Sequence, residues 1–537
     1  MVLSLSPLPQ QAAVASAHPL ASDAGHEILA AGGNAFDAAV AVSAVLAVVE
    51  PYSSGLGGGG FWLLHRAADG FEVMLDGRER APLAAQRDLY LDASGAVIPG
   101  LSIDGVLAAG IPGEPAALDH LARRYGRLPL ARSLAPAIRV ARDGFPVDAR
   151  YRRMALRRLA ALNASPAAAA RFLVQGEVPP EGYLVRQPEL AATLEALAAE
   201  GRDGFYRGSV GRKLVQGVRA AGGIWSDADL AQYRVVERPP VRGEYRGLRI
   251  TSASPPSSGG VVLLTMLNIL ARYDLDALPP VTRIHLLVEA MRRAYRDRAT
   301  YLGDPDFVDM PLQRLVHPWY AAGLARDIRL DRATPSPALE PPPGGRDTTH
   351  FSILDREGNR VAATLSINYP FGSGFVAPGT GVLLNDEMDD FSARPGSPNV
   401  YGLVGGEANA IAPGKRMLSS MTPTFVETAD GVAVLGTPGG SRIISMLLLA
   451  VLELADGKGP AAWVSRGRFH HQYLPDRIQY EPGALSPEQV SGLEAMGHRL
   501  RLLEHPYGNM QALFWNRRTG SVEAASDPRG GGSAIVR

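Results

Sequence analysis

The sequence predicts an α+β protein with strands in the middle and helices packed outside them. Two long apolar stretches have helical spacing, FDAAVAVSAVLAVVE at 36–50 and RIISMLLLAVLELA at 442–455. A glycine-rich turn at 55–60 leads into two strand-like segments, FWLLH and FEVML. A proline- and glycine-rich stretch late in the chain precedes a second pair of alternating segments, which is typical of a β-hairpin.

Composition excludes several classes of protein. The 537 residues would suggest three or four domains at roughly 100–200 residues each. Because the net charge is zero, no basic excess is available for nucleic-acid phosphates. The absence of cysteine excludes disulfides, thiolate nucleophiles and cysteine-ligated metal sites. The longest apolar stretch, Ala38 to Val49, is shorter than the about 20 residues that span a bilayer, so it predicts a buried helix and no membrane partner.

The first half of the chain alternates between the two kinds of element. Residues 23–50 predict two helical runs separated by Gly32-Gly33-Asn34, with Asp37 capping the second run. The two strands that follow end at Asp76-Gly77-Arg78. Residues 113–232 have helical spacing, and 284–301 predict another helix.

The N-terminal segment, Met1 to Ala17, has neither a basic n-region nor a clean apolar h-region. As written, the chain is expected to be cytoplasmic. If an export signal has been trimmed, a periplasmic location is expected instead.

The clearest boundary is the linker at 335–347, where PSPALEPPPGGR has no hydrophobic period and predicts an exposed, extended connector. Directly after it, alternating residues from 349 to 353, a turn at 355–359 and the segment RVAATLSIN predict a hairpin. Thr348 therefore stands at the first position of a strand, next to a segment that can be cleaved.

A threonine hydroxyl is a poor nucleophile until a base removes its proton. If threonine is the first residue of a chain, its own α-amine, with a pKa of about 7.7–8.0, can act as that base. Cleavage between Asp347 and Thr348 would create this arrangement. On the residues alone, a structural threonine at the start of a strand is the commoner case, and both interpretations stay open.

The segment TTHFS at 348–352 resembles the start of the small subunit in γ-glutamyltransferases, also called γ-glutamyltranspeptidases or glutathione hydrolases. Further motifs resemble the same family, in order and over almost the whole chain. They are HPLAS (18–22), GGNAFDAAVA (32–41), GLGGGGF (55–61), DGRERAP (76–82), NYPFGSG (368–374), GVLLNDEMDDFS (381–392), PGSPNVYGLVGGEANAIAPGKRMLSSMTPT (395–424), GTPGGSRI (436–443), GRFHHQ (467–472) and ASDPR (525–529).

The resemblance implies the four-layer αββα sandwich of N-terminal nucleophile hydrolases. A precursor would cleave itself into a large subunit, 1–347, and a small subunit, 348–537, which together form one intertwined domain and a heterodimer. The enzyme would transfer γ-glutamyl groups, from donors such as glutathione, to water or to an amino acid or peptide amine. No cofactor is expected.

The resemblance also implies the catalytic residues. Thr348 matches the nucleophile, and Asp347 with Thr348 matches the cleavage site. Thr349 and Ser366 match hydroxyls beside the nucleophile, although the family's usual residue at the second position is threonine. Gly439 and Gly440 match the oxyanion hole, which backbone N–H groups at a strand-to-helix turn can form.

A γ-glutamyl group carries an α-carboxylate and an α-ammonium, so its pocket needs both cationic and acidic groups. The implied ligands are Arg78, Ser419 and Ser420 for the carboxylate and Asn368, Glu387 and Asp390 for the ammonium. The planar guanidinium of arginine suits bidentate binding of a carboxylate. Residues 395–406 resemble a lid with Tyr401 at its tip, which argues for a small, enclosed substrate.

Other interpretations compete with these. The acidic run at 386–390 lacks the spacing of a calcium loop, so no metal is expected. His470 and His471 are expected to be structural, and the glycine run at 55–60 lacks the ending of a phosphate-binding loop. Relatives that act on glutaryl-type side chains or oxo-acid amides, or that process capsules, are the nearest alternatives. An uncleaved, non-catalytic binding protein is a remote one.

Overall fold

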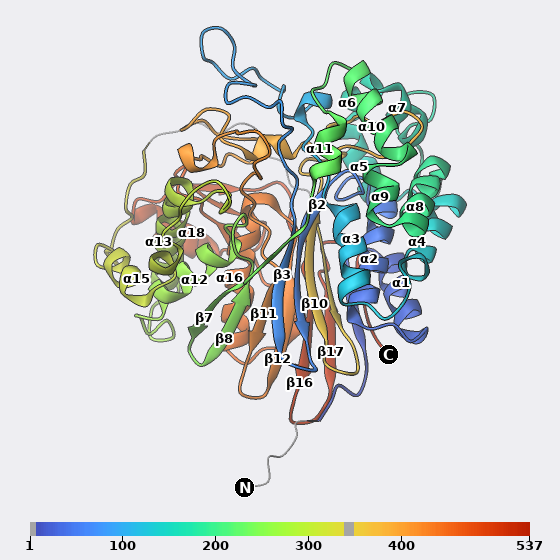
Figure 1. The fold of residues 1–537 in the computed structure, drawn as a ribbon. Helices are drawn as coiled ribbons and strands as arrows, with labels where there is room; N and C mark the ends of the chain where they lie inside the picture. Colours follow the sequence, from blue (N-terminus) through green and yellow to red (C-terminus); the bar gives the residue numbers. More distant parts are fainter. Residues whose placement is uncertain (1–6, 338–347) are drawn as a thin grey trace.

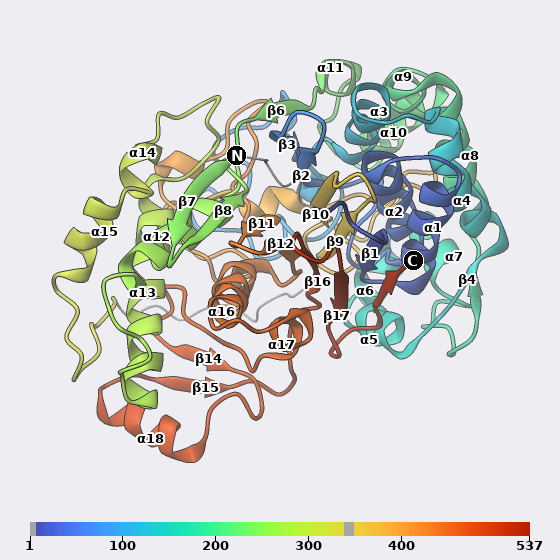
Figure 2. The ribbon, with the colours of Figure 1, turned by 90° about the horizontal axis from the view of Figure 1, so that it is seen from below.

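The computed structural model describes residues 7–337 and 348–537. Two β-sheets are stacked face to face, and helices cover the outer face of each (Figures 1 and 2). This arrangement confirms the predicted α+β sandwich of four layers. Asp347 and all of the linker after residue 337 lie outside the described residues.

The first sheet has seven strands, and its neighbours come from both sides of the linker. Strands from the C-terminal part lie next to strands from the N-terminal part at three places in the sheet. In spatial order they are β18 (Ser533–Val536), β1 (Ala13–Ser16), β9 (Thr349–Leu354), β10 (Arg360–Ser366), β2 (Gly59–Arg66), β3 (Phe71–Gly77) and β6 (Val236–Arg238). The predicted strand pairs β2–β3 and β9–β10 are both confirmed.

The register of these strands gathers several predicted site residues at one end of the first sheet. Thr349 pairs with Leu365, so β9 begins where β10 ends. Ser366, the last residue of β10, pairs with the first residue of β2. Gly60 pairs with Gly77, so Arg78 leaves β3 at the same end.

The second sheet has six strands. In spatial order they are β17 (Val522–Ser526), β16 (Gln511–Asn516), β12 (Gly431–Gly436), β11 (Thr424–Glu427), β8 (Leu248–Ser252) and β7 (Val241–Tyr245). Thr424 at the start of β11 pairs with Leu435 near the end of β12. The serines before β11 and the glycines after β12 therefore emerge together.

The helices on the first sheet come from the first half of the chain, where helices were predicted over residues 23–50 and 113–232. They are α1 (Pro19–Ala30), α2 (Ala35–Val49), α3 (Glu114–Arg124), α4 (Leu130–Asp143), α5 (Ala149–Arg157), α6 (Leu159–Ala164), α7 (Pro166–Phe172), α8 (Pro188–Glu200), α9 (Arg202–Tyr206), α10 (Ser209–Ala220) and α11 (Asp227–Gln232). Every residue of α2 is buried, and each fully buried valine or leucine contributes about 1.5–3 kcal/mol.

The predicted cap of α2 was wrong in detail. Asn34 is the N-cap residue, and its side chain accepts from the backbone N–H of Phe36 and Asp37. Asp37 completes a capping box by accepting from the N–H of Asn34 at 3.0 Å. Both residues satisfy backbone groups that a helix leaves unpaired, which is why an Asx–Asp pair begins this helix.

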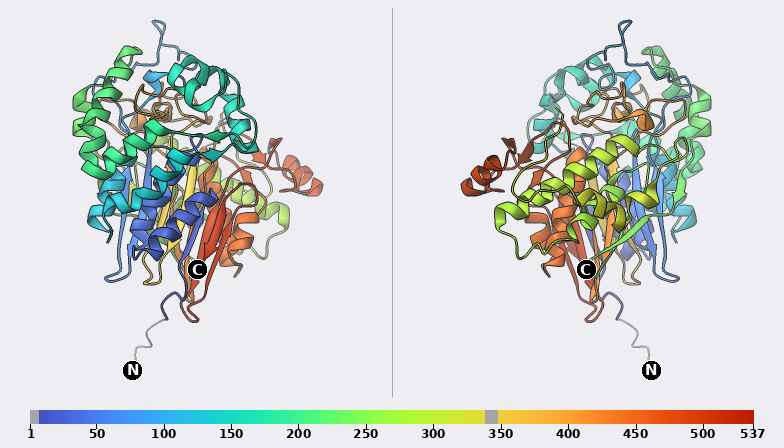
Figure 3. Two further views of the ribbon diagram at one scale, coloured as in Figure 1. Left: turned by 90° about the vertical axis from the view of Figure 1, so that its right-hand side faces the viewer. Right: turned by 90° about the vertical axis from the view of Figure 1, so that its left-hand side faces the viewer.

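The helices on the second sheet come from both halves of the chain. They are α12 (Gly259–Leu270), α13 (Pro280–Tyr301), α14 (Leu312–Leu315), α15 (Pro318–Ala325), α16 (Ile443–Ala455), α17 (Pro460–Ser465) and α18 (Pro487–Ala495). The helices predicted at 284–301 and 442–455 are thus confirmed. Two small sheets complete the fold, β4 (Phe145–Pro146) with β5 (Leu184–Val185), and β13 (Phe469–His470) with β14 (Ile478–Tyr480) and β15 (Leu500–Leu502). In the right-hand view of Figure 3, the yellow-green helix α13 runs across the side of the molecule that carries these helices.

The glycine run at 55–60 serves close packing. A Cβ atom at Gly57 would lie 2.0 Å from the carbonyl oxygen of Leu383, and one at Gly58 would lie 2.2 Å from that of Ser366. The run is required because backbone segments approach here, next to the end of β10. Across residues 7–337 and 348–537, no helix combines the length and the apolar character needed to cross a membrane.

Candidate active site

A small cavity lies where the ends of the two sheets meet. Its wall contains all the predicted catalytic and substrate-binding residues except Thr349 and Gly439. The additional lining residues are Leu403, Met421, Ser441 and Ile443. Thr348 directly precedes β9, is only 3% exposed, and is one of the lining residues.

Arg78 is the centre of a buried ionic network in this cavity. Its Nη1 donates to Glu387 Oε2 at 2.5 Å and its Nη2 donates to Asp390 Oδ2 at 2.6 Å. Its Nε donates to the backbone oxygen of Met417 at 3.2 Å. A third carboxylate, that of Glu79, lies 3.5 Å from Nη1. The predicted carboxylate-binding cation and the predicted ammonium-binding acids therefore lie in direct contact.

Burial and mutual charge set the protonation of this network. Burial alone would lower the pKa of Arg78, but Glu387, Asp390 and Glu79 outweigh it and raise that pKa. Burial raises the pKa of Glu387, and Arg78 opposes the rise. Burial and the charge of Glu387 raise the pKa of Glu79 well above its ordinary value. The surroundings therefore favour the charged form of Arg78 and disfavour the charged form of Glu79.

Ser419 and Ser420 lie in the loop before β11, on the opposite wall from β3. The Ser419 hydroxyl oxygen accepts from the backbone N–H of Met421 at 3.1 Å. The Ser420 hydroxyl oxygen accepts from Arg298 Nη2 at 3.3 Å. Each oxygen accepts from a protein donor, so the hydroxyl protons are oriented to donate elsewhere.

The turn between β12 and α16 contains the two glycines predicted for an oxyanion hole. Gly439 and Gly440 have φ values of 145° and 56°, which residues other than glycine rarely adopt. A Cβ atom at Gly440 would lie 2.5 Å from the ring of Tyr401. The Tyr295 hydroxyl fixes the turn from α13 by donating to the carbonyl oxygen of Ser441. The turn leads into the N-terminus of α16, where the helix dipole favours negative charge.

Two residues of the predicted lid, Tyr401 and Leu403, line the cavity. The Tyr401 hydroxyl donates to the carbonyl oxygen of Asn368 at 2.6 Å, so the tip of the lid is attached to the segment after β10. At the base of the lid, Asn399 Nδ2 donates to Asp390 Oδ1 at 3.0 Å, and the N–H of Val400 donates to Asp389 Oδ2 at 2.8 Å. Asn368 has a φ of 72°, a conformation that asparagine tolerates better than most residues.

Thr349 lies apart from the other predicted residues. Its hydroxyl donates to Glu50 Oε2 at 2.7 Å, and its side chain points away from the cavity wall because neighbours on a strand alternate. Ser366 lines the cavity, and its hydroxyl oxygen accepts from the N–H of Asn368 at 2.8 Å. Glu50, Tyr295 and Arg298 were missed by sequence reasoning, because they act through contacts between distant segments.

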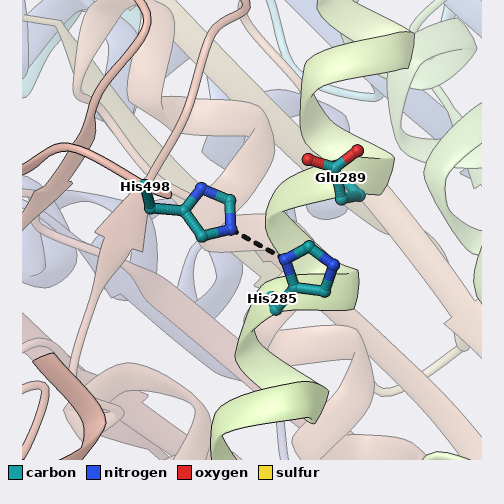
Figure 4. Close-up of side chains that lie close together, drawn as sticks. All are labelled: His285, Glu289 and His498. Atoms are coloured by element: carbon teal, nitrogen blue, oxygen red, sulfur yellow. Dashed lines mark hydrogen bonds between the residues drawn. The ribbon is translucent and has the colours of Figure 1, made fainter. Parts of the chain in front are cut away.

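One cluster has the composition of a metal site but a different hydrogen-bonding pattern. His285, Glu289 and His498 lie together in the interior (Figure 4). The two imidazoles are hydrogen-bonded to each other at 2.8 Å, and His285 Nε2 is hydrogen-bonded to the carbonyl oxygen of Arg329. The Glu289 carboxylate already accepts from four donors: Arg292 Nε, Arg293 Nη1, and the N–H and hydroxyl of Thr334. With its lone pairs occupied and two guanidinium groups beside it, Glu289 is poorly suited to bind a cation.

His470 and His471 also have partners inside the protein. His470 is hydrogen-bonded to Ser445 and Gln472, and His471 to Asp476. Burial lowers the pKa of His470 to about 3 and that of His471 to about 4. Their separate partners support the structural role predicted for this pair.

Comparisons with known proteins agree with the geometry. The profile of the γ-glutamyltranspeptidase family matches residues 21–537. A glutathione hydrolase proenzyme of Pseudomonas sp. (strain A14) is 45% identical, covering 90% of this chain and 86% of the relative. One of Escherichia coli (strain K12) is 42% identical, covering 97% and 90%. The crystal structure of cephalosporin acylase from Bacillus halodurans superposes with a TM-score of 0.87 at 28% identity, covering 99% of this chain and 96% of the other.

Proposed function

Because the chain belongs to the γ-glutamyltranspeptidase family, we propose that it is the proenzyme of a γ-glutamyltransferase and glutathione hydrolase that uses Thr348 as its nucleophile. The enzyme takes a γ-glutamyl amide as donor and passes the glutamyl group to water or to an amine. The large subunit, 1–347, and the small subunit, 348–537, form after cleavage between Asp347 and Thr348 and stay associated.

Processing creates the base that the later reaction needs. The Thr348 hydroxyl oxygen attacks the carbonyl carbon of Asp347, and the peptide bond to the Thr348 nitrogen breaks to give an ester. Water hydrolyses that ester, releasing the Asp347 carboxylate and leaving Thr348 with a free α-amine. This amine has a pKa near neutrality, so it can accept the hydroxyl proton in the next reaction.

Acyl transfer then follows in two steps. The Thr348 hydroxyl oxygen attacks the γ-carbonyl of the donor while the α-amine takes its proton, and the N–H groups of the Gly439–Gly440 turn stabilise the oxyanion. The C–N bond breaks, the leaving amine receives the proton, and a glutamyl ester forms on Thr348. Water or an acceptor amine attacks this ester and regenerates the hydroxyl.

The observation that carries this proposal is the composition of one small cavity. Thr348, Arg78, Glu387, Asp390 and a pair of serines all line this cavity. An acyl group with both an ammonium and a carboxylate complements this mixture of charges. A glutaryl group lacks the ammonium and would leave Glu387 and Asp390 without a cationic ligand, so an acylase activity fits this cavity less well.

The test combines intact mass under denaturing conditions with turnover of γ-glutamyl 4-nitroanilide. We expect two fragments divided at 347/348 and release of nitroaniline by the wild type. Thr348→Ala should give a single chain with no turnover, because it lacks the hydroxyl for both reactions. A threonine on a neighbouring strand, Thr364→Ala, provides a matched control, and it should be processed.

Two results would contradict the proposal. Cleavage or turnover in Thr348→Ala would remove Thr348 from the role of nucleophile. Turnover of glutaryl 4-nitroanilide in preference to the γ-glutamyl compound would keep the nucleophile but replace the proposed substrate with that of an acylase.

A further inference from the structure

A second buried guanidinium lies behind the serine wall of the cavity. Arg298 is on α13, next to the turn of the helix that carries Tyr295, and is 4% exposed. Its Nε donates to the Ser258 hydroxyl at 2.9 Å and its Nη2 donates to the Ser420 hydroxyl at 3.3 Å. Unlike Arg78, it makes no ion pair with an Asp or Glu of the described ranges, 7–337 and 348–537.

A buried cation with no acidic partner is unfavourable in a folded protein. Removing a guanidinium from water costs free energy that a neighbouring carboxylate normally offsets. Burial lowers the pKa of Arg298, and the negative charge of Asp390 opposes this only from beyond contact distance. A carboxylate brought by a ligand would supply the missing counter-charge.

The direction of the hydrogen bond makes Ser420 a donor toward the cavity. Arginine has no acceptor atom, so the Ser420 oxygen must accept from Arg298. The Ser420 hydroxyl proton is then left for a second partner, and Ser420 lines the cavity. No residue of the described ranges accepts a hydrogen bond from the Ser420 hydroxyl, so an oxygen atom of a ligand can accept one.

Arg78 already uses three of its five N–H groups within the protein. Its two terminal nitrogens donate to Glu387 and Asp390, and its Nε donates to a backbone oxygen. The wall of the cavity and the layer behind it therefore contain cationic groups, Arg78 and Arg298, and acidic groups, Glu387, Asp390 and Glu79. An acyl group that carries one ammonium and one carboxylate complements both kinds of group, with its carboxylate on the side of Ser420.

We propose that Arg298 is a positioning and specificity-determining residue for the acyl group: it holds Ser420 as a hydrogen-bond donor and provides the positive charge that attracts the α-carboxylate. This inference rests on the proposed γ-glutamyl specificity of the cavity. Arg298 acts through Ser420, so its removal should weaken recognition of the carboxylate without removing the nucleophile or the oxyanion turn.

The test compares two substrates that differ only in the α-carboxylate. These are γ-glutamyl 4-nitroanilide and 4-aminobutanoyl 4-nitroanilide. For Arg298→Met we expect KM for the γ-glutamyl substrate to rise about 10- to 100-fold, as for loss of a hydrogen bond to a charged group. KM for the 4-aminobutanoyl substrate, and kcat for both, should change less than about threefold. Arg298→Lys, which keeps the charge, should restore part of the lost affinity.

The dependence on Ser420 is tested by a double-mutant cycle. Ser420→Ala should raise KM for the γ-glutamyl substrate in the wild type but add little in Arg298→Met, because the two residues act through one contact. Arg296→Met is the matched control, since Arg296 is on the same helix and partly exposed, and it should behave as the wild type. If Arg298→Met is not processed, Arg298→Gln, which keeps a donor for Ser258, is measured with the same expectation.

The outcomes separate the inference from the proposed function. An equal rise in KM for both substrates would assign Arg298 a purely structural role and overturn the inference. Additive effects of Arg298→Met and Ser420→Ala on KM would do the same. An unchanged KM in a processed Arg298 variant would overturn it as well. If the wild type itself does not release nitroaniline from the γ-glutamyl substrate, the proposed function fails, whatever the variants show.

Discussion

Among single residues, Glu114 shows how burial alone can make stability depend on pH. It is the first residue of α3, is fully buried, and neither carboxyl oxygen has a hydrogen-bond partner in the described structure. Burial raises the pKa of Glu114 to about 8. In the unfolded chain the group ionises near its ordinary value of 4.5. Between these values the unfolded state releases a proton that the folded state keeps, so stability falls as pH rises.

Glu114→Gln should therefore stabilise the protein in a pH-dependent way. At pH 7 the gain should be up to about 3 kcal/mol, and it should vanish well below pH 4.5, where both states of the wild type are protonated. The measurement is urea unfolding at pH 5 and pH 8 in the Thr348→Ala single chain, which avoids a two-chain equilibrium. Glu504→Gln on the surface should show no such trend. The same gain at both pH values would refute the raised pKa.

At the scale of an element, the lid at 395–406 is held by a few contacts. The Tyr401 hydroxyl bond to Asn368 attaches the tip, while Asn399 attaches the base to Asp390. Because Asp390 also pairs with Arg78, the lid and the ionic network share a residue. Closure of the lid and occupation of the cavity should therefore depend on each other.

Tyr401→Phe removes the contact at the tip and keeps the ring against Gly440. Loss of one hydrogen bond of about 1 kcal/mol should raise KM for γ-glutamyl 4-nitroanilide about fivefold, because the closed lid becomes less populated. Steady-state kinetics of the variant and the wild type measure this. Tyr473→Phe removes a hydroxyl that does not line this cavity, and it serves as the control. Wild-type KM in Tyr401→Phe would show that this bond does not hold the lid.

At the scale of the whole molecule, the sequence predicted the elements better than their contacts. Periodicity located α2, α16 and the β9–β10 hairpin because each lies within one continuous segment. β1 was missed: it is four residues long and its partners, β9 and β18, are distant in sequence. The segment 284–301 was predicted to be a helix, but its sequence did not indicate that Tyr295 and Arg298 would contact the site. Those contacts also join segments that are distant in sequence.

The candidate site shows the same division. Motif resemblance indicated Arg78, Glu387 and Asp390 as ligands of one substrate, but it did not indicate that they contact one another. That contact requires residues from β3 and from the segment after β10 to meet at one sheet end, which depends on register. Long-range pairing of this kind is set by the packed core, which leaves little trace in local sequence.

The interleaved sheets lead to a final prediction about the processed protein. In the first sheet β1 lies between β18 and β9, and β2 pairs with β10; in the second, β8 pairs with β11. Separating residues 1–347 from 348–537 would leave long unpaired strand edges and expose much of both cores, so the two fragments should not dissociate under native conditions. Native size exclusion should give one species that contains the mass of the whole chain, 57.0 kDa, or a multiple of it. Denaturing mass spectrometry of the same peak should give two fragments. On heating, the two fragments should unfold together in one transition. Elution of either fragment alone as a folded species would show that the two parts are independent domains.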